Sequence, residues 1–147
     1  MSTSRFAVAV HVLTLMAWSD DEPLKSDQIA MSVNTNPVVI RRMLCELAGE
    51  QLVVSQTGSM GGSRLARNPK QITLLDVYRA VESADVFSLH PKRPNKRCPV
   101  GSSIGTVLAE VRTEMDAAIA HVLTGITIGD VVLRLKPPGR GPEAGKK

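Results

Sequence analysis

The stretch TGSMGGSRLARNP, Thr57–Pro69, places three glycines within five residues, and two arginines spaced three apart follow them. Glycine permits positive φ angles and lets the backbone approach a ligand closely. A loop of this kind can hold the phosphates of a nucleotide, or it can form the tip of a β-hairpin that contacts DNA. The sequence on either side decides between these two interpretations.

The spacing of the glycines argues against nucleotide binding. A P-loop requires G-x-x-x-x-G-K-[ST] between a strand and a helix. Here the lysine is missing, and the strand-like segment SRLAR follows the glycines. The preceding segment, LVVSQ, has the pattern of a short strand. We therefore predict a β-hairpin whose turn is TGSMGG, residues 57–62.

The residues before this hairpin predict three helices. The first, over about 3–19, is apolar on two faces, so we expect its own domain to cover one face and a partner subunit the other. Ser26 is predicted to cap a short second helix, and Asn36 followed by Pro37 to begin a third that ends at Gly49. Two short helices joined by a tight turn are typical of a helix-turn-helix. With the hairpin after it, the motif becomes a winged helix.

The segment from Ser102 to Thr124 has the most regular pattern in the chain. Its apolar residues alternate spacings of four and three, which is typical of a coiled-coil seam over almost three heptads. At about 1.5 Å per residue this helix would be roughly 30 Å long. The seam consists of Ile104, Leu108, Val111, Met115, Ala118 and Val122.

The predicted elements divide the chain into four parts. Residues 1–83 form the winged helix-turn-helix, which closes with a helix capped by Thr73, and residues 84–101 form a loop. Residues 102–136 hold the long helix and a short last helix that Thr127 caps. The tail, 137–147, has nothing to bury and is expected to be disordered.

The stretch GGSRLARNPKQITLLDVYRAVE, residues 61–82, resembles the signature of the Rrf2 family of bacterial winged-helix transcription regulators. In that family a glycine-rich wing runs into RLAR, a proline turn and an ITLxDxxRAVE helix. The resemblance covers most of the chain and is most specific over 58–82. It implies a mainly α fold with a small β-hairpin, in which a long C-terminal helix forms a homodimer. It also implies a sequence-specific DNA-binding protein, usually a repressor. Separately, the apolar run from Phe6 to Trp18 is followed by no signal-peptide cleavage site, so we expect a buried first helix in a cytoplasmic protein.

Double-stranded DNA is therefore the expected partner, and the formal net charge of +4 permits a polyanionic one. The helix that begins at Pro37 would present its N-terminal residues to base edges in the major groove. Arginine can pair bidentately with guanine, and valine can contact a thymine methyl group. The predicted DNA contacts are Ser26, Asn36, Pro37, Val38, Arg41 and Arg42 on the helices, and Thr57, Gly58, Gly61, Gly62 and Arg64 on the wing. The alternative for the two helical arginines is a solvated helix face.

Two positions of the wing depart from the family pattern. Thr57 stands where an arginine is common, and Ser63 stands where an aromatic residue often follows the last glycine. Both departures weaken the wing as a probe of the minor groove. Arg64 and Arg67 either compensate or pair with acidic residues of the next helix. These departures also leave an alternative function open, namely a winged-helix protein–protein interaction module that does not bind DNA.

Some family members hold an iron–sulfur cluster through three cysteines in the loop before the long helix. This chain has two cysteines, and of these only Cys98 lies in that loop; Cys45 is expected in the core. Arg5 stands near the place where a carboxylate serves as a further ligand in some members. We therefore predict no cofactor and no metal site.

Cys98 is instead a candidate redox-sensing residue. Four basic residues lie close to it in the sequence, and positive neighbours stabilise the thiolate, which is the form that oxidants attack. The alternative is an inert thiol, and the nature of any small-molecule or redox effector stays open.

Further features of the sequence exclude other classes. His11 and His121 are expected to be packed core residues on apolar helices. No catalytic constellation is visible, so an enzyme is not predicted. No apolar run reaches the roughly 20 residues that a membrane-spanning helix needs, so no membrane association is predicted.

Overall fold

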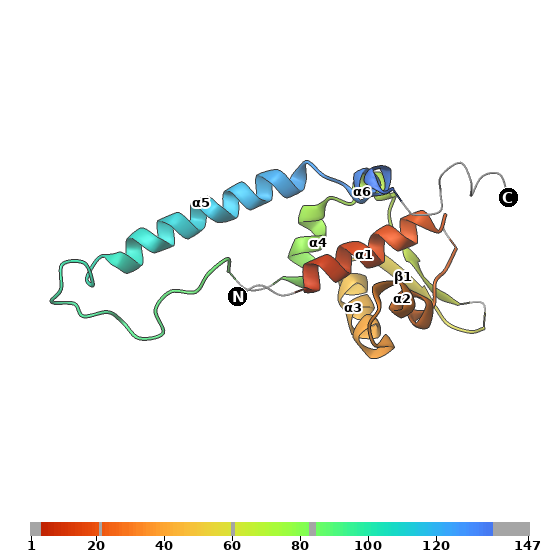
Figure 1. Cartoon of the computed structure of the whole chain (residues 1–147), viewed down its shortest axis with the longest axis horizontal. Coiled ribbons are helices and arrows are strands. Elements are labelled where there is room, and N and C mark those ends of the chain that lie inside the picture. Colours follow the sequence, from red (N-terminus) through yellow and green to blue (C-terminus); the bar gives the residue numbers. More distant parts are fainter. Residues whose placement is uncertain (1–3, 21, 60, 83–84, 137–147) are drawn as a thin grey trace.

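Helices dominate the computed structural model, which describes residues 4–20, 22–59, 61–82 and 85–136 (Figure 1). In chain order the elements are α1 (Arg5–Trp18), α2 (Ser26–Val33), α3 (Pro37–Gly49), β1 (Val53–Gln56), β2 (Gly62–Leu65), the 3-10 helix η1 (Pro69–Gln71), α4 (Leu74–Val81), α5 (Ile104–Thr124) and α6 (Ile128–Arg134). The two strands form an antiparallel hairpin directly after α3. This arrangement confirms the predicted fold class, a mainly α chain with a winged helix-turn-helix.

Side-chain caps fix the starts of several helices. The Asn36 side chain accepts a hydrogen bond from the backbone N–H of Val38 at 2.8 Å. Thr127 and Asp130 at the start of α6 form a reciprocal capping box, and these bonds lower the pKa of the Asp130 carboxyl below its ordinary value. Thr73 caps α4 in the same way. Three of the four predicted caps, Asn36, Thr73 and Thr127, are therefore confirmed.

The cap of α2 differs from the prediction by one residue. Ser26 is the first residue of the helix, and Lys25 occupies the cap position. The backbone N–H of Lys25 donates to Gln28 Oε1 at 2.8 Å. The glutamine therefore satisfies this end of the helix, and no serine hydroxyl is needed.

The core lies between α1, the helix pair α2–α3, α4 and the hairpin. Its fully buried side chains include Val12 and Leu13 of α1, Ile40 and Leu47 of α3, and Val77 of α4. The two histidines, however, were predicted wrongly as core residues. His11 is exposed, with its Nε2 2.9 Å from Ser32 Oγ. His121 is also exposed, because its helix α5 buries none of its residues in the single chain.

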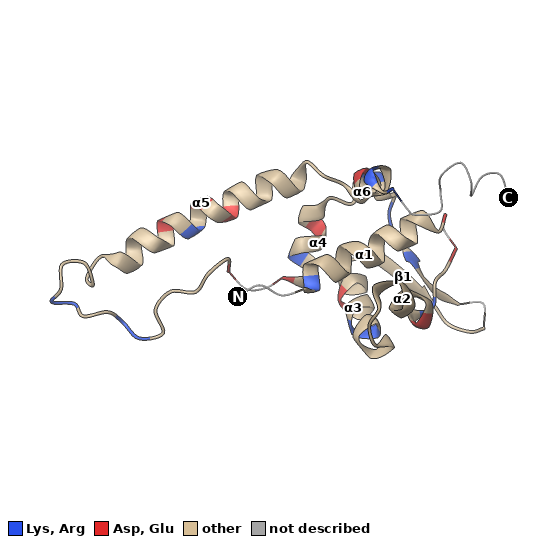
Figure 2. Ribbon diagram, viewed as in Figure 1, with Lys and Arg blue, Asp and Glu red and all other residues tan. Residues whose placement is uncertain are grey.

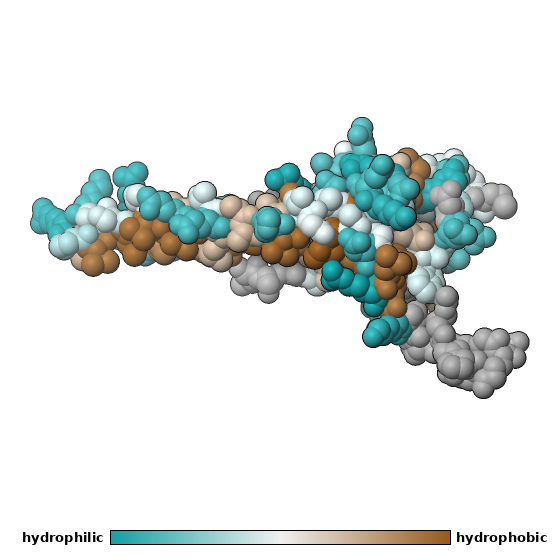
Figure 3. Space-filling model, turned by 90° about the horizontal axis from the view of Figure 1, so that it is seen from above, coloured by the Kyte–Doolittle hydropathy of each residue, from teal (hydrophilic) through white to brown (hydrophobic). Residues whose placement is uncertain are grey.

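Helix α5 projects from this body as an arm (Figure 1). Figure 3 shows a band of apolar side chains that continues from the body along the helix. The segment before α5 runs beside it, and Arg112 Nη1 lies 3.4 Å from Asp85 Oδ2. Four residues of the predicted seam, Val111, Met115, Ala118 and Val122, are exposed in the single chain, whereas Ile104 and Leu108 are half-buried.

After α5 the chain returns to the body through α6. The N–H of Leu74 donates to the carbonyl of Ile126 at 2.8 Å, and the N–H of Ile128 donates to the carbonyl of Ile72 at 2.9 Å. Ile128 is completely buried. The base of the arm is therefore fastened to the start of α4 by backbone hydrogen bonds and by one core side chain.

Within the described ranges no helix combines the length and apolarity that crossing a membrane requires. The predicted disordered tail, 137–147, lies outside the described residues. The proposed division into four parts stays a prediction.

Candidate DNA-binding surface

Helix α3 has one buried face and one exposed face. Ile40, Met43, Leu44 and Leu47 pack into the core. Val38 is 44% exposed, and Arg41 and Arg42 are also exposed. Neither arginine forms an ion pair with any residue that the structure describes. An apolar side chain and two guanidinium groups without an acidic partner among the described residues are therefore presented by the first half of this helix. Figure 2 marks the basic positions of α3 in blue on the ribbon.

Two glycines of the wing are required for different steric reasons. Gly58 has a φ of 96°, which disfavours any residue with a side chain. A Cβ atom at Gly61 would lie only 2.3 Å from the carbonyl oxygen of Gln56. The turn therefore needs glycine at position 58 for its backbone angle and at position 61 for its close packing.

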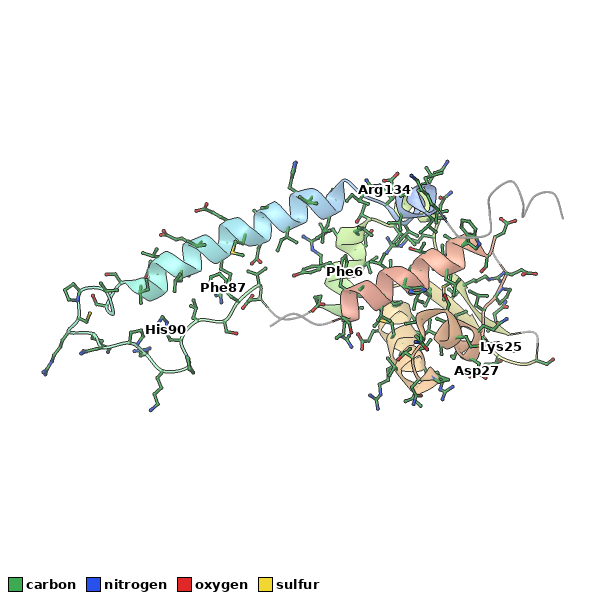
Figure 4. The ribbon with its side chains drawn as sticks, viewed as in Figure 1. Phe6, Lys25, Asp27, Phe87, His90 and Arg134 are labelled. Carbon is green, nitrogen blue, oxygen red and sulfur yellow. The ribbon has the colours of Figure 1, made fainter. Side chains whose placement is uncertain are left out.

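Lys25 is a functional candidate that sequence reasoning missed. Its Nζ donates to the carbonyl oxygen of Ser59 at 3.1 Å and to that of Gly61 at 3.3 Å. Figure 4 labels this residue at the start of α2, on the side of the molecule where the wing lies. The residue before Lys25 also reaches the wing, because Leu24 and Ser63 exchange backbone hydrogen bonds of 2.9 and 2.8 Å. The lysine thus joins the helix-turn-helix to the tip of the hairpin.

A groove of about 410 Å³ lies between α3 and the wing. It brings together five of the predicted residues, namely Ser26, Arg41, Gly58, Gly61 and Gly62. The lining does not include the other six, which are Asn36, Pro37, Val38, Arg42, Thr57 and Arg64. Of these six, Pro37, Val38 and Arg42 are on α3 together with Arg41, and Asn36 is the N-cap of that helix. Arg64 is on β2, opposite Val54, and forms no ion pair within the described part of the chain.

Cys45 also lines this groove and is exposed, so its predicted place in the core is wrong. It follows the buried Leu44 directly, and successive residues of an α-helix lie about 100° apart around the axis. That angle carries the thiol away from the core. The position of Cys45 next to the apolar stripe of α3, one helical step of about 100° away from it, was the sequence signal that could have predicted its exposure.

Two polar residues near the wing have structural roles. Arg67 Nη1 lies 3.6 Å from Asp76 Oδ2, and its Nη2 donates to the carbonyl of Glu50 at 3.4 Å. Ser63 is only 5% exposed, and its Oγ lies 3.0 Å from Ser55 Oγ. The structural alternative therefore holds for Arg67. Because Ser63 is buried, a larger residue at this position would first have to be accommodated within the fold and would not simply extend toward DNA.

The side chains do not fit an iron–sulfur cluster. Cys98 is exposed on the loop before α5, and Cys45 is on α3. Arg5 forms an ion pair with Glu46. No group of three or more histidine, cysteine or acidic side chains among the described residues could hold a metal ion. A cluster needs several thiolate ligands, and this loop offers one.

Comparison with known proteins shows which family of sequences and structures the chain resembles. A family model named Rrf2, described as an iron-dependent transcriptional regulator, matches residues 2–134. YwnA of Bacillus subtilis (strain 168), which carries the name of an HTH-type transcriptional regulator, is 42% identical over 92% of this chain and 99% of its own length. A crystal structure of a protein described as DNA-binding is 39% identical, with a TM-score of 0.70, over 87% of this chain and 98% of that one. The global cysteine regulator CymR of B. subtilis has the same fold, with a TM-score of 0.68 at 22% identity over 92% of this chain and 98% of its own.

Proposed function

The chain belongs to the Rrf2 family of transcriptional regulators, and from this premise we propose that it is a homodimeric repressor that binds a roughly palindromic operator. Helix α3 would enter the major groove, and the wing would contact the flanking sugar–phosphate backbone. The fold accounts for binding, and the side chains on α3 account for selectivity.

The observation that supports this proposal is the pair of arginines on α3. Arg41 and Arg42 are exposed, and neither is neutralised by an acidic side chain of the described residues. Arg41 lines the groove beside the wing glycines. A free guanidinium at this place can bind guanine or a phosphate, whereas a structural arginine would be committed, as Arg67 is to Asp76.

The seam of α5 supports the homodimer. Val111 and Met115 are each 41% exposed and Val122 is 57% exposed, although all three are apolar. These exposed apolar side chains would be buried if α5 packed against α5 of a second copy of the chain. Two α3 helices then meet two half-sites about one turn of DNA apart, roughly 34–36 Å.

Cys98 supports a redox response of this repressor. It is exposed in the segment that leads into α5, and its carbonyl accepts a hydrogen bond from the N–H of Ser102 at 2.9 Å. Oxidation of the thiol would therefore act at the start of the dimerisation helix. A disulfide with the other subunit is one form that the oxidised state could take. Since such a regulator acts on the chromosome, we place it in the cytoplasm.

The proposal is tested by selecting bound fragments from genomic DNA and measuring the affinity for the selected site. Arg41→Ala and Arg42→Ala should each weaken specific binding by about 1–3 kcal/mol if the lost contact is to a base edge. The dependence of affinity on salt concentration should also become less steep if the lost contact is to a phosphate.

Arg134→Ala is the matched control, because Arg134 is on α6 at the opposite side of the molecule from α3 (Figure 4). This variant should bind like the unmodified protein. An unmodified protein that shows no salt-dependent DNA binding would refute the repressor and favour the protein–protein interaction module.

A further inference from the structure

A second groove lies away from the wing, between α1, the end of α2, and α6 with the residues that follow it. Its volume is about 740 Å³, which falls in the range of small-molecule sites, about 300–1,000 Å³. Six apolar residues line it: Ala7, Val10, Leu15, Trp18, Val131 and Leu135. The remaining lining residues are His11, Thr14, Ser32 and Lys136. Such a mainly apolar lining with a few polar groups is typical of a ligand pocket.

Thr14 is the anomaly in this groove. The residue is only 7% exposed, and its Oγ1 has no hydrogen-bond partner among the residues that the structure describes. Buried hydroxyl groups are nearly always paired, because leaving them unpaired costs free energy. Threonine in a helix populates two χ1 rotamers. A change of χ1 rotamer redirects the hydroxyl, and because Thr14 lines the groove, a bound molecule could pair with it.

The charges of the groove restrict what it can hold. Lys136 supplies a cation, and no aspartate or glutamate of the described residues is part of the lining. The imidazole of His11 and the hydroxyl of Ser32 already contact each other at 2.9 Å. An anionic group is thus attracted by the lysine, whereas a cationic group finds no partner.

We propose that this groove binds a small amphipathic anion, a monocarboxylate with an aliphatic or aromatic body. The body would lie along the apolar side chains of α1 and α6. The carboxylate would pair with Lys136, and an oxygen of the ligand would accept a hydrogen bond from Thr14.

Such a ligand would touch two parts of the molecule that matter for regulation. Ser32 belongs to α2 of the helix-turn-helix, and Val131 belongs to α6 at the base of the arm. A molecule between them would bias the angle between the DNA-binding body and α5. This regulatory consequence rests on the proposed function, whereas the binding itself does not.

The chain provides its own reporter, because Trp18 is its only tryptophan and lines the groove. Titration of the full chain with decanoate should change the tryptophan fluorescence in a saturable way. Decanol has the same body without the charge, and it should bind at least about tenfold more weakly, a difference of about 1.4 kcal/mol.

Two substitutions test the polar contacts. Thr14→Val removes the hydroxyl and keeps the volume, and Lys136→Gln removes the charge; each should weaken decanoate binding at least fivefold. Lys92→Gln, in the exposed loop before α5, is the matched control and should leave the affinity unchanged. Equal affinity for decanoate and decanol, or unchanged affinity in both groove variants, would overturn the proposal.

A second copy of the chain is the rival occupant. Ala7→Glu places a charge at an exposed position in the groove. If decanoate binding is lost while the sedimentation coefficient is unchanged, the ligand site is supported. If the variant dissociates into monomers, the groove belongs to the subunit interface and the proposal is wrong. Because fluorescence is measured without DNA, failure of the DNA-binding proposal leaves this test intact.

Discussion

Gly61→Ala tests the reasoning about the wing most directly. The new Cβ would lie 2.3 Å from the carbonyl oxygen of Gln56 and 2.8 Å from the carbonyl carbon and oxygen of Thr57. These are backbone atoms, so no flexible side chain can move aside. We therefore expect an overpacking cost of about 1–3 kcal/mol.

This cost is confined to the hairpin if the wing can open while the core stays folded. The melting temperature would then fall by less than the roughly 2–4 °C per kcal/mol expected for global unfolding of a chain this size. Hydrogen exchange of the β1 and β2 amides would report the local loss. DNA affinity should fall as well, because the displaced turn no longer meets the backbone of the DNA.

Gly49→Ala is the matched control, since it makes the same chemical change at the end of α3. A Cβ there would meet nothing within 4 Å. Alanine is favoured over glycine in a helix by about 0.5–1 kcal/mol, so this variant should be neutral or slightly stabilised. The reasoning is refuted if Gly61→Ala matches the unmodified protein in strand exchange and in DNA affinity.

Three further predictions concern the arm and the last helix. Val111→Asp should raise the dimer dissociation constant by about two to four orders of magnitude, since an unpaired buried charge costs about 3–5 kcal/mol; sedimentation velocity measures this, and Thr113→Asp off the seam is the control. Mild peroxide should lower the DNA affinity of the unmodified protein and not that of Cys98→Ser; equal responses of the two proteins would exclude a thiol switch. Asp130→Asn should lower the melting temperature at neutral pH, and the deficit should disappear under acid conditions, because only the ionised carboxylate of Asp130 is stabilised by the N–H of Thr127. The reason is that the pKa of Asp130 is lowered from an ordinary value of 3.8, so its stabilisation is complete above that pH and is lost as the pH falls through the lower, folded-state value. A deficit that persists at low pH would contradict this role.

The parts of the fold that depend on local interactions were predictable from the sequence. Asn36, Thr73 and Thr127 each cap a helix through hydrogen bonds that span two or three residues, so the pattern of side chains alone determines them. The glycine spacing of the hairpin likewise depends on local backbone geometry. These features gave the correct order of helices and strands.

The parts that depend on contacts between distant segments were not predictable. Lys25 donates to carbonyls 34 and 36 residues away, and no local pattern announces such a bond. Periodicity showed that the helices bearing His11 and His121 are apolar, but an apolar helix still has to be placed against a neighbour before its buried face is known. The single chain gives α5 too little cover to bury any of its residues, so His121 stays exposed.

Lys25 also separates two properties that usually act together. Two of its three ammonium hydrogens are directed to carbonyl groups of the wing, which leaves little capacity for direct hydrogen bonding to a phosphate. Its positive charge is unaffected by those bonds and continues to act on a nearby polyanion over about 8–10 Å at ordinary ionic strength. The residue can thus accelerate the approach of DNA through its field while it holds the hairpin tip in a shape that needs little reordering when the two meet.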